Sequence, residues 1–400
     1  VTFAESFHDE YYPYDINKNG MGIFRHNNQY PEGKVTIVNG TIEQSETENI
    51  PTTIGGFNPI YIANQLDFEI AGISVDYHTP QTFGMYFRYA EGDVNIHHNI
   101  FKDRGARINN RHGSSGGRSI FFRYSKQGGN SYSIYNNLIK RTRQNGLSQA
   151  QNIHNNEIYV DSWSTNAFAI QPLSEVGTNA GSISDNKIFL TGYHAIGISW
   201  AHEDLQANNN FIHMEGINTE KNRWYESFGD QNSLNGLRIS NYSPGGQVRN
   251  NLHYDKNLII GNARHGSLIR GTELYGDYSI TNTIVSNSLI KINAEDEETI
   301  RVSSVVTQGT SSIESNPTYY KNLTLSSNIS NIRFGDDYGR GYNHHFYDIV
   351  FEKEGDNPNY HTFIFDGGYS RDGHIIRDPI FKNGARYDDV YWQRTGDLSA

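Results

Sequence analysis

Residues 95–101 of the chain read Asn-Ile-His-His-Asn-Ile-Phe: apolar and polar residues alternate up to an asparagine, and a second apolar strand follows it. The same phrase returns at residues 133–139 as Ser-Ile-Tyr-Asn-Asn-Leu-Ile. Its asparagines lie at intervals of 38, 19, 30 and 23 residues, at Asn99, Asn137, Asn156, Asn186 and Asn209. Self-similarity at such intervals is typical of stacked structural units.

The intervals are those of single solenoid coils whose loops vary in length, because each coil buries its inward residues only by stacking on its neighbours. Asparagine suits a sharp corner between two strands, since it tolerates the left-handed backbone conformation. The sequence therefore predicts an all-β, right-handed parallel β-helix with three parallel sheets per coil and an Asn ladder. A β-sandwich built of hairpins is the alternative, and the scarcity of two-residue Asn-Gly hairpin signals disfavours it.

We expect one solenoid over residues 1–400. In it residues 1–34 cap or flank the first coil, residues 35–335 form the main coils, and residues 336–400 form less regular C-terminal coils. A cap is expected because an open solenoid end exposes a sheet edge.

Composition narrows the partners of the chain. The formal net charge of −11 argues against a nucleic-acid partner, and no apolar run approaches membrane-spanning length. Cysteine is absent, which excludes disulfides and thiolate metal sites. We expect a secreted or periplasmic bacterial protein whose signal peptide has been removed.

A second phrase follows each asparagine corner after a strand and a variable loop, and we assign it to the first parallel sheet. It reads GMYFRYA at residues 84–90 and SIFFRYS at residues 119–125. Further members are NGLSQA (145–150), AFAIQPLS (167–174), AIGISWAH (195–202), NGLRISNY (235–242) and GSLIRGTE (266–273). Because side chains alternate between the faces of a strand, these are expected to point inward: Met85, Phe87, Ile120, Phe122, Phe168, Ile170, Ile196, Ile198, Leu237 and Ile239.

The outward positions predict a groove of Arg, Tyr and Gln with scarcely any carboxylate. Its expected substrate-binding residues are Tyr61, Tyr86, Tyr124, Gln171, Trp200, His202 and Arg238. A glycoside hydrolase ordinarily needs two carboxyl groups beside the scissile bond, and a calcium site needs several oxygen ligands. We therefore expect no metal and no cofactor, and an acidic polysaccharide whose carboxylates bind arginine.

Alignment of the segments FRYAE and FRYSK places Arg88 under Arg123 and brings Lys126 to the coil next to Tyr89. These four are the predicted catalytic residues. In β-elimination a cation neutralises the uronate carboxylate, a base removes the adjacent proton, and an acid protonates the leaving oxygen. We expect the arginines to neutralise, and Tyr89 and Lys126 to share the proton transfers. The alternative is a stacked pair of Tyr89 and Tyr124 beside arginines on a solvated face.

With these phrases, residues 35–335 resemble the right-handed β-helix polysaccharide lyases, particularly those that degrade alginate. The resemblance is one of architecture, since no strict signature motif carries it. It implies that Arg, Lys, Tyr and His share the neutraliser, base and acid roles, and we carry those roles only to the four predicted catalytic residues. The calcium-binding acidic cluster of some of these lyases has no counterpart here.

Three classes of function follow. The first is a lyase that cleaves an acidic, uronate-containing polysaccharide such as alginate. The second is a glycoside hydrolase on an acidic or sulfated glycan, with carboxylates from loops that contain Glu175, Glu203 or Asp204. The third is a non-catalytic carbohydrate-binding solenoid.

Overall fold

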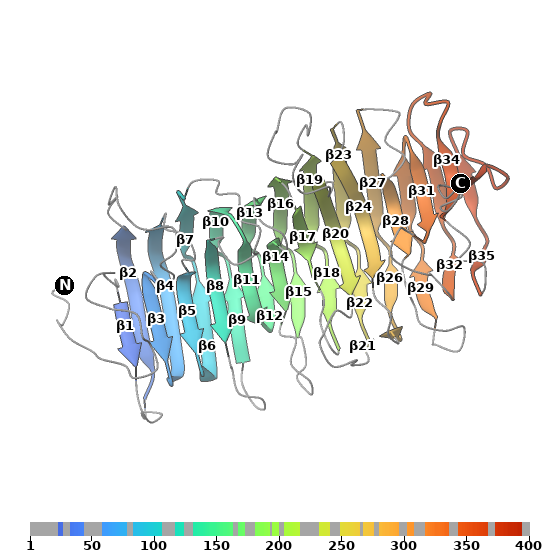
Figure 1. The fold of residues 1–400 in the computed structure, drawn as a ribbon. Coiled ribbons are helices and arrows are strands. Elements are labelled where there is room, and N and C mark those ends of the chain that lie inside the picture. The colour runs from blue at the N-terminus through green and yellow to red at the C-terminus, as the bar shows by residue number, and fades with distance from the viewer. Residues whose placement is uncertain are drawn as a thin grey trace, which may run out of the picture.

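The chain winds into a right-handed parallel β-helix, as the sequence predicts, and successive coils stack along one axis from the blue end to the red end of Figure 1. The computed structural model describes residues 23–26, 33–43, 58–77, 83–105, 117–123, 131–162, 167–172, 181–192, 194–199, 204–216, 232–240, 249–264, 267–275, 280–295, 302–307, 317–335, 343–366 and 373–393. Within these ranges, no helix has the length and apolar character needed to cross a membrane.

Sheet A is a ladder of thirteen parallel strands that runs the length of the solenoid. Its strands are β1 (Ile23–His26), β3 (Ile60–Ala63), β5 (Phe83–Arg88), β8 (Arg118–Arg123), β11 (Asn145–Ala150), β14 (Ala167–Pro172), β17 (His194–Ile198), β20 (Asn232–Ser240), β24 (Ser267–Tyr275), β28 (Ser303–Thr307), β31 (Ser330–Phe334), β34 (His361–Asp366) and β37 (Val390–Gln393).

Sheet B has 22 strands, which fall into two columns on either side of the asparagine corner. The first column is β6 (Glu91–His97), β9 (Ser131–Tyr135), β12 (Asn152–His154), β15 (Ser182–Ser184), β18 (Gln206–Asn208), β22 (His253–Asp255), β26 (Ile284–Ser286), β29 (Thr318–Lys321), β32 (His344–Tyr347) and β35 (Ile375–Arg377). The second is β7 (Ile100–Asp103), β10 (Leu138–Thr142), β13 (Glu157–Ser162), β16 (Lys187–Gly192), β19 (Phe211–Gly216), β23 (Leu258–Ala263), β27 (Leu289–Ala294), β30 (Thr324–Ser327), β33 (Val350–Lys353) and β36 (Ile380–Lys382). Strands β2 (Val35–Glu43) and β4 (Leu66–Tyr77) run through both columns, and β21 (Arg249–Asn250) pairs with β25 (Ile280–Thr281).

The predicted Asn ladder is present at the corner of sheet B. Asn156, for example, donates from Nδ2 to Asn186 Oδ1 at 3.0 Å and to the carbonyl of Ile134 at 3.0 Å, while its own Oδ1 accepts from the backbone and side-chain nitrogens of Asn137 at 3.0 Å. The ladder joins Asn99, Asn137, Asn156, Asn186, Asn210, Asn257 and, at its end, Ser288. Each of these amides is buried and hydrogen-bonded from coil to coil.

One ladder assignment from the sequence is wrong: the fifth member is Asn210 and not Asn209. Asn209 has a φ of 56° and makes the corner itself. A positive φ also occurs at the residue before each of the four preceding ladder asparagines, at His98, Asn136, Asn155 and Asp185. The left-handed residue turns the chain, so the next residue can direct its amide into the ladder.

The core fills the space between the two sheets with apolar side chains. Met85, Phe87, Ile120, Phe122, Ile170, Ile198, Leu237 and Ile239 point inward as expected. Phe87 stacks on Phe122 with ring centroids 4.8 Å apart, and Phe122 stacks on Tyr132 across the interior at 5.0 Å. The aromatic stacks thus follow the coils, as the backbone hydrogen bonds do.

We predict that removal of one ladder amide destabilises the whole solenoid. Asn156→Ala should lower the free energy of unfolding by about 2–5 kcal/mol, because the buried N–H of Asn137 and the carbonyl of Ile134 both lose a partner. Chemical denaturation measures this loss. The neighbouring Asn155 is exposed and has a φ of 55°, so Asn155→Gly is a matched control that should be neutral or stabilising. Equal stability of the two variants would contradict the ladder's role.

The C-terminal coils bury a histidine whose protonation state depends on pH. His344 is fully buried and stacks on His374 with centroids 5.5 Å apart, and the ring of Tyr320 lies 6.1 Å away. Burial lowers the pKa of His344 well below its ordinary value, and His374 and His345 add to the effect. The imidazole is therefore neutral in the folded protein.

We predict that stability is full above pH ~6.5 and falls by up to about 1.4 kcal/mol per pH unit below it, because the unfolded chain then binds a proton that folded His344 rejects. Thermal melting between pH 4 and pH 8 measures this slope. In His344→Phe, which keeps a ring for the stack, the slope should be shallower. Identical slopes in the two proteins would exclude His344 as the cause.

Candidate functional site

The outer face of sheet A carries two rows of side chains because the strands do not alternate strictly. In β11 both Gly146 and Leu147 face the core: a Cβ on Gly146 would meet the Ile158 side chain at 2.9 Å, and Leu147 is fully buried in the core. Asn145 and Ser148, on either side of this pair, hydrogen-bond to each other at 2.9 Å. The double inward step repeats along the sheet at Gly197 and Gly236.

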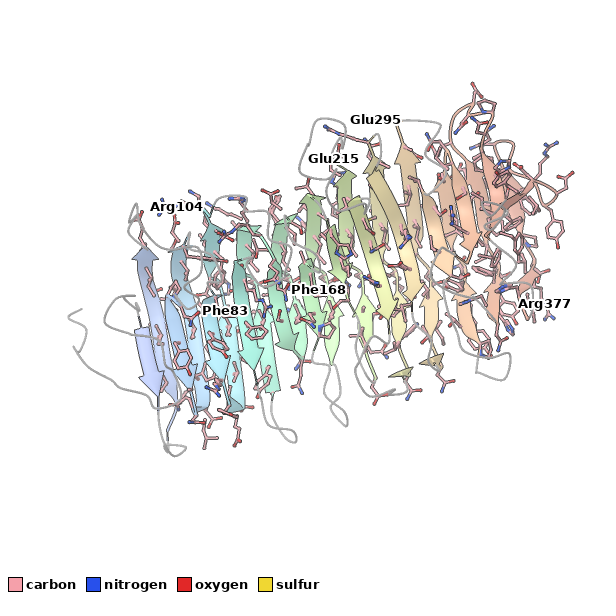
Figure 2. The ribbon with its side chains drawn as sticks, in the orientation of Figure 1. Phe83, Arg104, Phe168, Glu215, Glu295 and Arg377 are labelled. Carbon is pink, nitrogen blue, oxygen red and sulfur yellow. The ribbon has the colours of Figure 1, made fainter. Side chains whose placement is uncertain are left out.

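This irregularity corrects two sequence expectations. Phe168 and Ile196 were predicted to point inward, but they are in register with Asn145 and Asn235 and lie on the outer face. The physical reason is the pair of consecutive inward residues, which shifts the alternation by one position. Figure 2 shows Phe83 and Phe168 over the strands of sheet A.

Strand register defines both rows. The first row is Phe83, Arg118, Asn145, Phe168, Ile196, Asn235, Arg270, Ser303, Ser330 and His361. The second row is Tyr61, Tyr86, Phe121, Ser148, Gln171, Ser199, Arg238, Glu273, Val306, Arg333, Ile364 and Tyr391. Among these described residues, arginine recurs and Glu273 is the single carboxylate.

Three of the four predicted catalytic residues, Arg88, Tyr89 and Arg123, lie at the N-terminal end of this face. Arg88 and Arg123 are register partners on β5 and β8, as the alignment of the two phrases expects. Tyr89 follows Arg88 at the strand end, where the Arg88 guanidinium lies 5.1 Å from the centroid of the phenol ring. Tyr89 has a φ of 52°, which is the left-handed backbone conformation, and this conformation costs a residue other than glycine about 1–2 kcal/mol. Such strain is found more often at functional sites than elsewhere.

Tyr61 and Tyr86 belong to an aromatic cluster on the same end of the face. Their rings meet edge to face at 5.3 Å and are only 2% and 3% exposed. Phe83 stacks on Phe121 at 5.0 Å, and the Arg118 guanidinium lies 4.6 Å from the Phe121 ring centroid. The two tyrosines are packed within this cluster, and their predicted contact with sugar stays a prediction.

Two further predicted residues lie along the second row. Gln171 is half-buried and accepts from Asn145 Nδ2 at 3.5 Å, while Arg238 is six strands further along sheet A than Tyr61. The other predicted site residues, Tyr124, Lys126, Trp200 and His202, lie outside the described residues.

A buried charge cluster was missed by the sequence reasoning. Glu273, 1% exposed, forms an ion pair with Arg238, whose Nε lies 3.2 Å from the Glu273 carboxylate, and also pairs with Arg270 Nη1. His194 on the adjacent coil lies in the field of both arginines. Burial lowers the pKa of His194 to about 3, with the charges of Arg238 and Arg270 as the second and third causes. The imidazole is therefore neutral at physiological pH, beside an ion-paired triad.

The signal for this cluster was in the sequence. The phrase GSLIRGTE places Arg270 and Glu273 three residues apart, the same spacing as Asn235 and Arg238 in the preceding coil. Under strict alternation those two positions fall on opposite faces. Only the double inward step, which the structure reveals, brings both of them outward.

At the C-terminal end of the face, a second missed group is the pair of His361 and Asp389. The Nδ1 of His361 lies 3.1 Å from Asp389 Oδ1, and the imidazole stacks on Tyr391 with centroids 4.9 Å apart at 16°. Asp389 is in the turn between β36 and β37, so no strand periodicity identifies it. Over the described ranges, no group of three or more His, Asp or Glu side chains is placed to hold a metal ion.

Comparison with known proteins adds no further guide to this site. The chain matches no known family. No curated protein and no solved structure matches it either. Functional inference therefore depends on the residues of the outer face.

We predict that Glu273→Gln destabilises the protein by about 3 kcal/mol, because both Arg238 and Arg270, which are largely buried, lose their counter-charge. Thermal and chemical denaturation measure the loss. The ion pair of Lys291 with Glu354 at 2.9 Å is more exposed, so Lys291→Ala should cost at most about 1 kcal/mol. A Glu273→Gln variant as stable as Lys291→Ala would mean that Glu273 does not hold the cluster together.

Proposed function

We propose that this chain is a secreted lyase that binds an acidic, uronate-containing polysaccharide along the outer face of sheet A and cleaves it by β-elimination. The observation that carries the proposal is the charge of that face. In a protein with a net charge of −11, its described rows contain four arginines and one carboxylate, with Arg88 and Arg123 next to them. Alginate is the polymer that we favour.

The chemistry of elimination fits such a face. Elimination requires loss of the proton next to the uronate carboxylate, and a guanidinium bound to that carboxylate stabilises the negative charge that develops. Arginine binds carboxylates in a bidentate manner, which also fixes the orientation of the sugar. On this face we expect Arg88, whose register partner on the next coil is Arg123, to bind one such carboxylate.

The length of the face suits a polymer rather than a small molecule. Arg88 on β5 and Arg238 on β20 are five strands apart in sheet A, which is about 24 Å at ~4.8 Å per strand. Contacts at remote positions supply binding energy that can be used at the reacting bond.

A glycoside hydrolase is the second candidate, and the carboxylates argue against it. Hydrolysis with retention needs two carboxyl groups about 5–5.5 Å apart, and inversion needs a larger separation. Glu273 is the single carboxylate of the described rows, and two arginines hold it. Of the loop carboxylates expected for a hydrolase, Asp204 accepts from Asn251 Nδ2 at 2.9 Å, and Glu175 and Glu203 lie outside the described residues.

The test is ultraviolet absorbance of alginate, pectate, hyaluronan, chondroitin and carrageenan treated with the protein. Elimination leaves an unsaturated uronate that absorbs, whereas hydrolysis releases reducing ends without a rise in absorbance. We predict a rise with at least one uronate polymer and a loss of about 10-fold to 100-fold in kcat/KM for Arg88→Ala, since a charge-assisted hydrogen bond contributes about 1.5–3 kcal/mol.

Binding should also weaken with salt, because exposed charges are screened beyond about 10 Å at 0.1 M ionic strength. In the combined Arg88→Ala, Arg123→Ala and Arg238→Ala variant this salt dependence should be largely lost. Affinity that ignores salt in the native protein, or that survives the triple replacement, would rule out the arginine face. Reducing ends without new absorbance would point to the hydrolase.

A further inference from the structure

The proposed elimination needs a proton acceptor, and His361 has the geometry of one. Its Nδ1 is 3.1 Å from Asp389 Oδ1, so the carboxylate holds the ring and its tautomer in place. The backbone supports the pair, because the amide of Phe363 donates to the carbonyl of Asp389 at 3.2 Å. The Nε2 edge makes no hydrogen bond to the part of the chain that the structure describes.

The surroundings of His361 separate it from the other histidines near the C-terminal end. Its side chain is 27% exposed, whereas His344 is fully buried in the core. One ring face is against Tyr391, which is itself 39% exposed and belongs to the second row one coil further on. The imidazole is therefore held by a carboxylate and a ring, and about a quarter of its side chain is exposed to solvent.

The charged groups around the pair come from the same turn. Arg386 is three residues before Asp389, and its side chain is 72% exposed, with Nε 3.9 Å from Asp388 Oδ1. Its backbone amide donates to Thr362 Oγ1 at 3.1 Å, which anchors the turn to β34. The guanidinium of Arg386 is thus exposed and weakly held, and it is the group of this turn that we expect to supply the cation for β-elimination.

We propose that His361, oriented by Asp389, is the catalytic residue that transfers the proton in the elimination. This inference rests on the proposed function and assigns the proton transfer to the C-terminal end of the face, in place of Tyr89. A phenol ionises near pH ~10 in water, whereas a neutral imidazole accepts protons at physiological pH.

The step balances without a further reactant. Nε2 of His361 takes the proton from the sugar carbon next to the carboxylate, and the electron pair of that carbon–hydrogen bond forms the new carbon–carbon double bond. The bond from the neighbouring carbon to the glycosidic oxygen breaks, and the imidazolium returns the proton to this oxygen. Asp389 stabilises the imidazolium, and Arg386 neutralises the uronate carboxylate during the step.

The position of His361 gives the Arg88 region a different role. Nine strand steps along sheet A separate β5 from β34, which is about 43 Å at ~4.8 Å per strand. Arg88 and Arg123 then bind carboxylates of sugar units distant from the cleaved bond. Loss of Arg88 should mainly raise KM, and loss of His361 should mainly lower kcat.

The experiment compares His361→Gln with native protein on the polymer that gives the largest absorbance rise. We expect kcat to fall about 100-fold or more, with KM changed less than about threefold. His253→Gln is the matched control: its imidazole is on sheet B, where Nδ1 lies 3.2 Å from Gln206 Oε1, and it should keep full activity. Thermal melting checks that both variants are folded.

Two further variants separate catalysis from structure. His361→Gly should regain turnover when free imidazole is added, which a residue with a purely structural role would not show. Asp389 is a positioning residue, so Asp389→Glu, which keeps a carboxylate, should retain more activity than Asp389→Asn.

The proposed function and this inference fail in different ways. A native protein that gives no absorbance rise on any polymer overturns both. An active native protein whose His361→Gln variant keeps its kcat within twofold overturns the inference alone. Loss of turnover in Tyr89→Phe, with His361→Gln still active, returns the proton transfer to the N-terminal end.

Discussion

The hydrogen bond from one coil to the next is the interaction on which the structure depends. Strand pairing provides it along both sheets, and at the corner of sheet B the ladder from Asn99 to Ser288 provides it through side chains. Every ladder amide satisfies groups of its neighbours, so no coil is independent of the next. A buried amide left without partners costs more than the net gain of an average hydrogen bond, which favours asparagine at each ladder position before Ser288 ends the row. Loops of very different length can therefore leave the coils without disturbing them.

The outer face of sheet A inherits its order from this stacking. A residue placed outward in one coil has its counterpart directly above it in the next, so like positions form rows. The rows bring four arginines together on this face, of which Arg270 and Arg333 are buried, and the double inward step is what allows two outward rows on each strand. The small residues that permit the step, such as Gly146 and Gly236, are required because a Cβ there would meet core side chains at 2.9 Å and 2.8 Å. Packing inside the solenoid thus determines which side chains a ligand meets outside.

The features that repeat from coil to coil could be predicted from the sequence, and those that do not repeat could not. The recurring asparagine phrase predicted the coils, the corner and four ladder positions, because hydrogen bonding between identical coils leaves a periodic pattern. At QANNNF (206–211) the three adjacent asparagines hid which one enters the ladder, and the structure selects Asn210. The assumption of strict alternation predicted the wrong face for Phe168 and Ile196, because two consecutive inward residues cannot be predicted from strand geometry alone. The pair of His361 and Asp389 joins a strand to a turn more than twenty residues later, and a contact of this kind has no local signature.

The side chains of each outer row are also spaced at a fixed interval along the solenoid. Their interval is the spacing of hydrogen-bonded strands, about 4.8 Å, and no substitution of a side chain can lengthen or shorten it. A bound polymer has its own repeat, which is set by its sugar rings and linkages. Wherever the two repeats differ, successive units drift out of phase with successive coils, so equivalent contacts recur only at intervals along the face. If the proposed function holds, the backbone of the solenoid would therefore discriminate among polymers by their period, before any single side chain did so by its chemistry.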